Sequence, residues 1–417
     1  MKIYKFGGAS LKNAEAIIGL GKLILSKHDR PLVVIVSAMG KMTNAFEEMV
    51  NAYFKNRNHL IKTLHLIKQY HGSIVNELFD TPQIELETIL ENLYSEIHFF
   101  FQNELHNDHA YVYDQTVVYG ELISSHIIFY YLKSIDIKVN LIDSRNCIKT
   151  DSYYRDANVD WKKTVDLINH HVDSDYMTLA QGFIAGDLKG NSTTLGREGS
   201  DYTAAIYGYA LDAKSVTVWK DVRGILNANP KIFEPTVLIN EISYREAIEL
   251  AYYGASVIHP KTIQPVQRKK IPFYVKSFKY PHKAGTKIGL GHKIQPKVSC
   301  FIKKEKLVLL KISTLDFSFM IEKNISEVFG LLYQYQMKVE LTQNSAISYS
   351  VCFYNKYQRL VELISVLKQK FKVIVNRNVT LYTIRHFNQE AIDRVTGNGK
   401  KVLLEQRGQE TVHFVCV

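Results

Sequence analysis

Three separate stretches of the sequence combine residue types that can hold an anion. In the first, Lys5 is followed by Gly7 and Gly8, at the end of a short apolar run that is typical of a strand. Glycines after a strand let the backbone approach a ligand closely, and the start of a following helix offers free amide groups to a phosphate. A Gly-Gly pair at such a turn also serves plain packing, so phosphate binding and packing are both open here.

The second stretch, residues 37–44, follows the apolar run Leu32–Val36. Ser37 and Thr43 carry hydroxyl groups in this stretch, and loops at the carboxyl ends of parallel strands are where α/β proteins bind ligands. The two hydroxyl groups fit a carboxylate or a phosphate. Equally, Thr43 or Asn44 fits the N-cap of a helix that starts here.

The third and most specific stretch, residues 193–205, is rich in glycine and threonine and leads into a predicted helix. Arg197 offers a planar guanidinium that can grip a carboxylate at two points. Ser200 or Asp201 fits the N-cap of the helix. The alternative is an ordinary capped surface loop in which Arg197 forms a solvated ion pair.

Length and composition limit the class of protein. The chain has 417 residues, 46% of them hydrophobic and 22% charged, which predicts roughly two or three folded domains and excludes disorder as the main state. The net charge of +11 comes without a dense basic run or zinc-finger spacing, so we predict no nucleic-acid partner. Scattered cysteines indicate a reducing compartment, and the lack of a signal-peptide core or of an apolar run of about 18 residues predicts a cytoplasmic protein without membrane contact.

The three stretches must be positioned by an α/β domain. Apolar runs predict strands at residues 2–6, 32–36, 137–142, 176–181, 215–219 and 273–277. Helical spacing predicts helices at residues 13–27, 120–132, 201–211, 244–253 and 260–269, and an all-helical excursion over about residues 43–107. Glycines and polar residues near position 290 mark a boundary, so this domain is predicted to span residues 1–290.

The remainder of the chain predicts two small α+β units of ferredoxin-like order. A strand, a helix, two strands, a helix and a strand fit residues 303–376. A second, shortened round fits residues 377–417 and stops before its last helix. Two copies of one unit after an α/β domain are typical of ligand-sensing modules rather than of catalytic ones, although this is an argument from architecture alone.

Four motifs resemble, in the same order, the signatures of aspartate kinases of the amino-acid kinase family. They are Lys5–Ser10, Thr193–Ala205, Trp219–Gly224 and Gly254–Pro260. The resemblance covers essentially the whole chain, and the paired C-terminal units resemble ACT domains. It implies an amino-acid-kinase-like three-layer sandwich with a mainly parallel sheet. It also implies a phosphotransferase that converts ATP and L-aspartate to ADP and 4-phospho-L-aspartate, the first step of lysine, threonine and methionine biosynthesis.

The resemblance further implies a role for each matching residue. Lys5 neutralises the transferring phosphoryl group, and Asp201 orients that lysine. The implied ATP contacts are Lys5, Gly7, Gly8, Lys220, Asp221 and Lys231. The implied aspartate contacts are Ser37, Thr43, Glu121, Arg197 and Ser200, with Glu121 on the substrate ammonium and Arg197 on the α-carboxylate. Mg²⁺ bridges the phosphates with water-rich coordination, so no metal site made of protein ligands is predicted.

The chain departs from the family pattern at several points. Glu198 stands where a glycine is usual, Lys220 where a threonine or serine is usual, and Ser256 where a lysine is usual. Our hypothesis is that Lys220 supplies the charge lost at Ser256. The alternative is a solvent-facing Lys220 and a weaker hold on the nucleotide. The departures leave two rival functions: another amino-acid kinase of the same fold, and a catalytically weakened relative that binds an amino acid as a regulatory subunit.

The resemblance to ACT domains also bears on regulation and assembly. Family members that respond to lysine bind it at the stretches that here include Glu340, Asn344 and Ser345. An amino-acid effector site and a structural role in dimer pairing are both open for these residues, and the effector stays unnamed. Because ACT-like sheets can pair between subunits, a homodimer or a higher homo-oligomer is expected.

Overall fold

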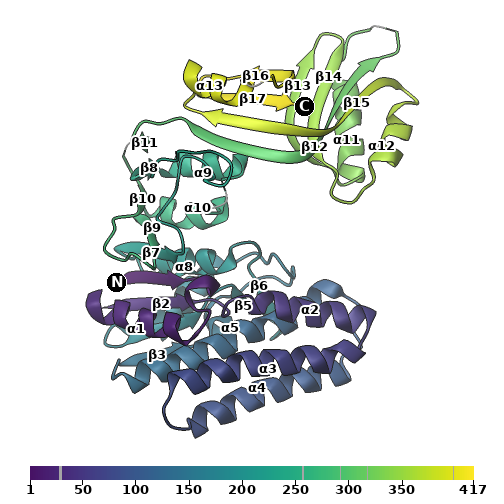
Figure 1. Ribbon diagram of the computed structural model, residues 1–417. Coiled ribbons are helices and arrows are strands. Elements are labelled where there is room, and N and C mark those ends of the chain that lie inside the picture. Colours follow the sequence, from purple (N-terminus) through teal and green to yellow (C-terminus); the bar gives the residue numbers. More distant parts are fainter. Residues whose placement is uncertain (28–30, 256–257, 292, 317, 398) are drawn as a thin grey trace. The chain divides into compact units, whose positions relative to one another are not determined.

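The chain folds into two compact units (Figure 1). The computed structural model describes residues 1–417 except 28–30, 256–257, 292, 317 and 398. The first unit comprises residues 1–225, 238–252 and 256–296, and the second comprises residues 226–237, 253–255 and 297–417. The segment 226–237, which the sequence analysis places inside the first domain, therefore groups with the C-terminal unit.

The first unit is built on a nine-stranded, mainly parallel sheet. The strands, in their order across the sheet, are β11 (Ile294–Gln295), β8 (Glu241–Ser243), β10 (Thr286–Gly289), β9 (Phe273–Ser277), β7 (Ser215–Lys220), β1 (Lys2–Phe6), β2 (Leu32–Val36), β4 (Met177–Gln181) and β3 (Val139–Ile142). All neighbours from β9 to β3 are parallel, whereas β10 runs antiparallel to β9 and β11 to β8. A separate hairpin joins β5 (Ile184–Gly186) and β6 (Ser192–Thr194).

Helices cover both faces of this sheet, which explains why its central strands are apolar throughout. They are η1 (Gly8–Ser10), α1 (Ala14–Lys27), α5 (His109–Ser134), α6 (Ser144–Cys147), α7 (Trp161–His171), α8 (Gly199–Ala210), α9 (Tyr244–Tyr253) and α10 (Pro260–Arg268). Alternate residues of β1 point to opposite faces. Tyr4 and Phe6 pack into the core that includes residues of α1 and α5, whereas Lys5 points to α8 and meets Asp201 there.

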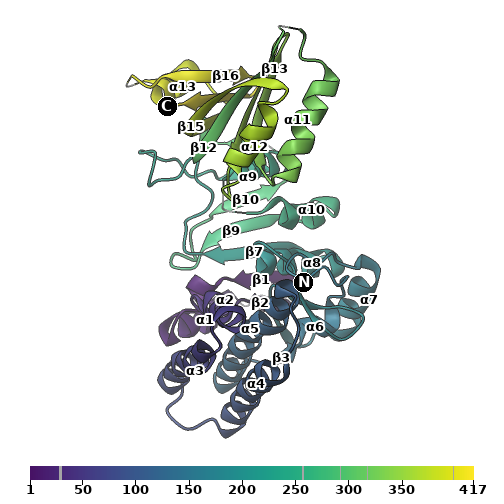
Figure 2. The same ribbon diagram turned by 90° about the vertical axis from the view of Figure 1, so that its right-hand side faces the viewer.

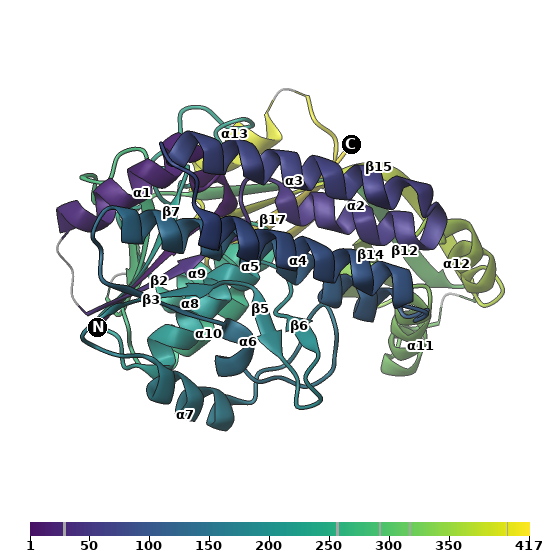
Figure 3. The same cartoon turned by 90° about the horizontal axis from the view of Figure 1, so that it is seen from below.

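The predicted helical excursion consists of α2 (Met42–Lys55), α3 (Asn58–Leu78) and α4 (Ile84–Asn103). These helices lie side by side (Figure 3), and an ion pair between Lys68 Nζ and Glu91 Oε2 at 2.8 Å joins α3 to α4. Their apolar stripes continue the core formed by α1, α5 and the sheet. No helix in the described part of the chain is long and apolar enough to span a membrane.

The second unit is a six-stranded antiparallel sheet with three helices. Its strands, in their order across the sheet, are β13 (Lys338–Ser345), β14 (Ser348–Tyr354), β12 (Cys300–Thr314), β15 (Phe371–Arg385), β17 (Thr411–Cys416) and β16 (Val402–Arg407). Figure 2 shows α11 (Glu322–Gln334) and α12 (Leu360–Leu367) together on one face, and α13 (Gln389–Thr396) follows β15. The predicted fold class, a mainly parallel α/β domain followed by α+β units, is confirmed.

Two long strands join the two predicted ACT-like units into this one sheet. The second half of β12, Val308–Thr314, pairs with Phe371–Arg377, and its first half, Cys300–Lys304, pairs with Leu381–Arg385. The predicted first α+β unit, residues 303–376, starts too late to include the beginning of this strand, Cys300–Ile302. The shortened C-terminal unit therefore obtains a strand from a segment that precedes the other unit in the chain.

Candidate active site

A cavity of about 360 Å³ lies at the carboxyl ends of β1, β2, β4 and β7, where parallel α/β sheets bind ligands. Most of its lining comes from the loops that directly follow these strands and from the first turn of α8. Its lining residues are Lys5, Gly8, Ser37, Ala38, Gly40, Thr43, Tyr113, Glu121, Phe183, Gly196, Glu198, Gly199, Ser200, Asp201 and Lys220. Eight residues of this set were predicted as site residues from the sequence.

Two lysines meet one buried carboxylate in this cavity. Lys5 Nζ lies 2.6 Å from Asp201 Oδ1, and Lys220 Nζ lies 2.9 Å from Asp201 Oδ2. β1 and β7 are adjacent parallel strands, so their lysines approach the start of α8 together. Burial alone would raise the pKa of Asp201, but the charges of Lys5 and Lys220 outweigh it and hold that pKa below its ordinary value. Asp201 therefore carries a negative charge that fixes both ammonium groups.

The side chain of Lys220 faces the cavity rather than solvent. Its burial acts against the charged form, but Asp201 and Glu198 together hold its pKa above the ordinary value. Asp201 holds two ammonium groups at this end of the cavity, and Glu198 brings a second carboxylate that offsets part of their charge. Such an end can accept the phosphates of a nucleotide.

The loop after β1 and the loop after β2 contact each other through their backbones. The amide of Gly40 donates to Gly8 O at 3.0 Å. A Cβ atom on Gly8 would lie 2.6 Å from Gly40 O and 2.8 Å from Ala38 O, so only glycine allows this approach. Gly8 thus serves close packing, and it also reaches the cavity wall.

Glu121 provides a buried carboxyl group at another position of the cavity wall. It lies on α5, is 2% exposed, and accepts one hydrogen bond, from the amide of Ala38 to its Oε1 at 3.4 Å. Its Oε2 has no hydrogen-bond partner within the described part of the chain. Burial raises the pKa of Glu121 to about 8, although the Ala38 amide acts in the opposite direction. A buried carboxylate with an open acceptor is suited to receive an ammonium group from a ligand.

The start of α8 is shaped by an unusual backbone. Glu198 has φ +54°, a left-handed conformation that costs free energy for a residue with a side chain. Gly199 and Gly182 are tightly enclosed, because a Cβ at either position would lie 2.5 Å from Phe183 or Ser200, respectively. Ser200 is buried and lines the cavity, whereas Arg197 is exposed and is not among the lining residues.

The remaining predicted site residues lie elsewhere. Gly7 and Asp221 do not line the cavity, and Asp221 is exposed. Lys231 is exposed on the segment 226–237 of the second unit. Ser256 lies outside the described residues, so its pairing with Lys220 in our hypothesis stays a prediction.

The predicted effector residues lie at the edge strand β13. Glu340 forms ion pairs with Lys304 and with Lys338, the latter at 3.2 Å. The Ser345 hydroxyl lies 2.9 Å from that of Ser348, and Asn344 is exposed. Because Glu340 already has two cationic partners, its carboxylate is engaged within the sheet.

Two aromatic lining residues were missed in the sequence analysis. Phe183 directly follows Gly182 at the end of β4, so the rule that strand ends carry ligand loops was sufficient to find it. Tyr113 lies on α5, where the guanidinium of Arg155 stacks 4.0 Å from its ring centroid. No local pattern distinguishes Tyr113 from the other apolar residues of that helix.

The described part of the chain also bears on the question of a metal site built from protein ligands. Among the described residues, no group of three or more His, Cys, Asp or Glu side chains is placed to hold a metal ion. Both oxygens of Asp201 are paired with lysines, which leaves Glu198 Oε2 as a buried acceptor without a hydrogen-bond partner in the described residues. This set fits a magnesium ion that arrives with ATP and keeps phosphate oxygens and water as most of its ligands.

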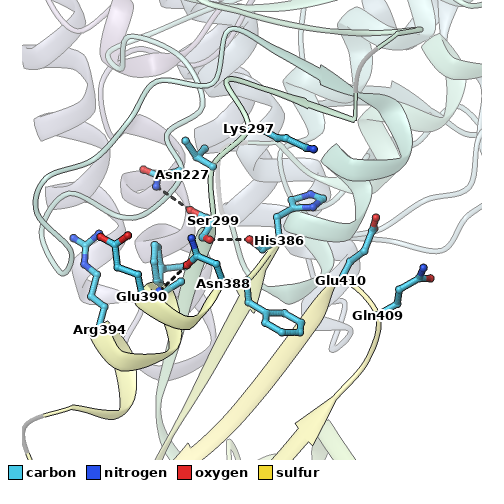
Figure 4. A pocket seen from close by; sticks show the side chains of 13 residues that line it. Asn227, Lys297, Ser299, His386, Asn388, Glu390, Arg394, Gln409 and Glu410 are labelled. Carbon is cyan, nitrogen blue, oxygen red and sulfur yellow. Dashed lines mark hydrogen bonds between the residues drawn. The ribbon is translucent and has the colours of Figure 1, made fainter.

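A larger cavity of about 570 Å³ lies in the second unit (Figure 4). Its polar side chains connect chain segments to one another. Asn227 Nδ2 donates to Ser299 O at 2.9 Å, Ser299 Oγ to His386 O at 2.7 Å, and Asn388 Oδ1 accepts from the Ala391 amide at 2.8 Å. One lining residue, Glu410, forms an ion pair with Arg385 at 3.4 Å. Asp201 is instead shared by two lysines that line the same cavity as it does, so the smaller cavity is the candidate active site.

Comparisons with known proteins show which family the chain belongs to. Residues 1–277 match the amino acid kinase family. The lysine-sensitive aspartokinase 3 of Escherichia coli is 30% identical over 353 residues, which cover 83% of this chain and 76% of that protein. A bifunctional aspartokinase/homoserine dehydrogenase of Buchnera aphidicola is 32% identical over 301 residues, 69% of this chain, but the match covers only 36% of that longer protein.

A solved structure of Escherichia coli aspartokinase III in complex with aspartate and ADP superposes with a TM-score of 0.83 at 25% identity, covering 100% of this chain and 96% of that one. The chain belongs to the amino acid kinase family. Within that family it is an aspartokinase, because its relatives share both the kinase domain and the C-terminal region.

Proposed function

We propose that the chain transfers the γ-phosphoryl group of ATP to the side-chain carboxylate of L-aspartate. The observation that carries this proposal is the pair of lysines held by buried Asp201, in the same cavity as the open carboxylate of Glu121. One end of the cavity is suited to phosphates and the other to an amino acid's ammonium group. The Escherichia coli relative was crystallised with aspartate and ADP, which supports both ligands.

The reaction needs positioning more than proton transfer. The acceptor carboxylate is already ionised at neutral pH, so one of its oxygens attacks the γ-phosphorus without a general base. The bond from that phosphorus to the bridging oxygen of ADP breaks, and ADP leaves with both electrons. Lys5 and Lys220 offset the charge on the transferring oxygens, and Mg²⁺ bound to the phosphates adds a further positive charge.

On the substrate side, we assign Glu121 to the ammonium group of aspartate, and Ser37, Thr43 and Ser200 to its carboxylates. Arg197 keeps its proposed role on the α-carboxylate, and its guanidinium is exposed. Gly7 and Gly8 are assigned to the phosphates. Asp221 and Lys231 are assigned to the nucleotide on the sequence resemblance alone.

The test is direct detection of aspartyl phosphate as its hydroxamate, together with ADP release, on the purified chain with ATP, Mg²⁺ and L-aspartate. We expect steady formation of both products and at least about a hundredfold preference for aspartate over glutamate, since an extra methylene displaces the acceptor oxygen. A preference for glutamate or a related acid would support a different amino-acid kinase. Aspartate binding without product would support the regulatory relative.

We further propose that the second unit senses an amino acid and supports a homodimer. The Escherichia coli relative was also crystallised with lysine and aspartate, which favours lysine as the first effector to test. Titration of lysine, threonine and methionine against activity, and light scattering of the purified chain, test the two parts separately. A cytoplasmic location stays a prediction, since a relative from Arabidopsis thaliana is named as chloroplastic.

A further inference from the structure

A tyrosine outside the cavity touches both loops that form its phosphate and substrate sides. Tyr70 lies on α3, and its hydroxyl donates to Lys12 O at 2.6 Å, at the end of the loop that follows β1. The same hydroxyl reaches the loop that follows β2, because a Cβ atom built on Gly40 would lie 2.5 Å from it. Gly40 has φ +54°, so glycine is favoured there by the backbone as well as by Tyr70.

These two loops carry the groups assigned to both substrates. The first holds Gly7 and Gly8, and the second holds Ser37 and leads into the first turn of α2, where Thr43 lies. They are joined at their inner ends by the bond from the Gly40 amide to Gly8 O. The Tyr70 hydroxyl adds a second connection between the two loops. Because Tyr70 belongs to α3, this helix helps to set the distance between the loops.

The helix that carries Tyr70 is itself firmly held. Leu60, Ile67, Ile74 and Val75 of α3 are buried in the main core of the first unit. Burial raises the pKa of Tyr70 above its ordinary value, so the hydroxyl stays protonated and able to donate across the neutral pH range. α3 is therefore suited to act as a brace for the two loops.

We propose that Tyr70 is a positioning residue for phosphoryl transfer, which aligns the phosphate loop with the acceptor loop from outside the cavity. The inference rests on the proposed function for its kinetic readout only. In this proposal, α3 of the helical excursion holds the two loops at the distance that in-line transfer requires.

Tyr70→Phe removes the hydroxyl alone and is the first test. We expect kcat/KM for aspartate to fall about tenfold to hundredfold, because misplacing reacting groups by a fraction of an ångström has effects of this size. The matched control is Tyr53→Phe on α2, whose hydroxyl donates to Glu104 O at 2.9 Å, away from the cavity. Both variants should lower the melting temperature to a similar extent, but only Tyr70→Phe should lower kcat/KM. Equal kinetic losses in the two variants, or a change below twofold in Tyr70→Phe, would overturn the inference.

A second test uses the close approach to Gly40. Gly40→Ala places a methyl group against the Tyr70 hydroxyl and should lower kcat/KM by more than tenfold. Adding Tyr70→Phe should make the double variant better than the product of the two single losses, because the steric conflict disappears with the hydroxyl. Strictly multiplicative losses would count against contact between these residues as the cause.

Binding of ADP, measured by calorimetry on the same variants, separates this inference from the proposed function. If the unmodified chain forms no aspartyl phosphate, the proposed function fails. The proposed role of Tyr70 is then tested by the affinity for ADP alone. Tyr70→Phe should weaken that affinity at least fivefold, and Tyr53→Phe should change it less than twofold. An ADP affinity that is the same in both variants would reject the brace in that case.

Discussion

The two cavities of the molecule differ in how they hold charge. In the first unit, Lys5 and Asp201 are 8% and 2% exposed and form an ion pair. In the second unit, Lys297, Glu390 and Arg394 line the larger cavity and are exposed. The half-buried Glu410, which also lines it, pairs with Arg385 at 3.4 Å. Burying an ion costs several kcal/mol unless it is well paired, so a buried network is expensive to maintain.

The difference in charge indicates the ligand-binding cavity better than the volumes of the two cavities do. The larger cavity offers space, but its polar groups mostly fasten neighbouring segments together. The smaller cavity contains Glu121, whose buried carboxyl group has an unpaired oxygen, Oε2, among the described residues. Burying this oxygen without a partner lowers the stability of the folded protein. Groups that destabilise the free protein and point into a cavity are those that a ligand satisfies.

Replacing Lys5 should have the largest effect on the first cavity. Lys5→Met removes a cation from the transferring phosphoryl group and should lower kcat by about 1,000-fold. Lys22→Met, at an exposed position of α1, is the matched control and should change kcat less than twofold. Steady-state ADP release measures both, with circular dichroism to confirm folding. A Lys5→Met variant that keeps a tenth of the activity would remove Lys5 from the catalytic role.

Lys220 should come next in size. Lys220→Ala takes away the second partner of Asp201 and should lower kcat/KM for ATP about 100-fold, with a raised KM for ATP. Lys220→Arg keeps the charge and should recover part of the loss. If Lys220→Ala left both KM for ATP and kcat unchanged, the hypothesis that this lysine replaces the charge missing at position 256 would be wrong.

Glu121→Gln should raise KM for aspartate about 30-fold, since loss of one partner of a buried charge pair costs about 2 kcal/mol or more. Glu96→Gln, on the exposed side of α4, is the control of equal chemistry. Calorimetry with aspartate gives the binding part of the effect. A KM for aspartate that rises equally in both variants would contradict the assignment of the ammonium group to Glu121.

The pH dependence of aspartate binding tests the same residue. Because burial raises the pKa of free Glu121 to about 8, the ammonium must displace a proton at lower pH. KM for aspartate should therefore fall as pH rises towards about 8 and then level off, and Glu121→Gln should abolish this slope. The stability of the fold changes with pH in the opposite direction to aspartate binding. Folding takes up a proton between the ordinary pKa of 4.5 and about 8, so stability from this group is greatest below 4.5 and is lost as pH rises through 8.

Local patterns in the sequence were sufficient for the frame of the first unit. The strand that ends before Gly7 and the helix that starts near Asp201 follow from short-range periodicity, and so does the position of loops at strand ends. The predicted N-cap at Ser200 or Asp201 is wrong, because α8 begins at Gly199 and its N-cap is Glu198, which makes no side-chain cap bond. The pairing of Lys5 with Asp201 was expected from the motif resemblance. The pairing of Asp201 with Lys220 could not be predicted in this way. It depends on β1 and β7 being neighbours in the sheet, which no local pattern indicates.

Other features depend on contacts between distant segments and escaped prediction for that reason. Cys300–Lys304 forms a strand only because Leu381–Arg385 lies beside it, and its mixed polar sequence is weak alone. The contact of Tyr70 with Gly40 joins residues thirty positions apart through one hydroxyl. Arg197 shows the reverse case: its motif was recognised in the sequence, but the structure places its side chain on the surface and outside the cavity lining.

The smallest expected effect lies in the second cavity, and it tests the contrast from the other side. Arg394 donates to Glu234 O at 2.7 Å, and its guanidinium lies 5.1 Å from the ring centroid of Phe301. Arg394→Ala should lower the free energy of unfolding by about 1 kcal/mol, the usual value of one such bond, and leave kcat within twofold. Arg407→Ala, which loses an exposed ion pair with Glu405, should cost less. A tenfold fall of kcat in Arg394→Ala alone would mean that the exposed cavity also shapes catalysis, and the division between a charged catalytic cavity and a fastening one would no longer hold.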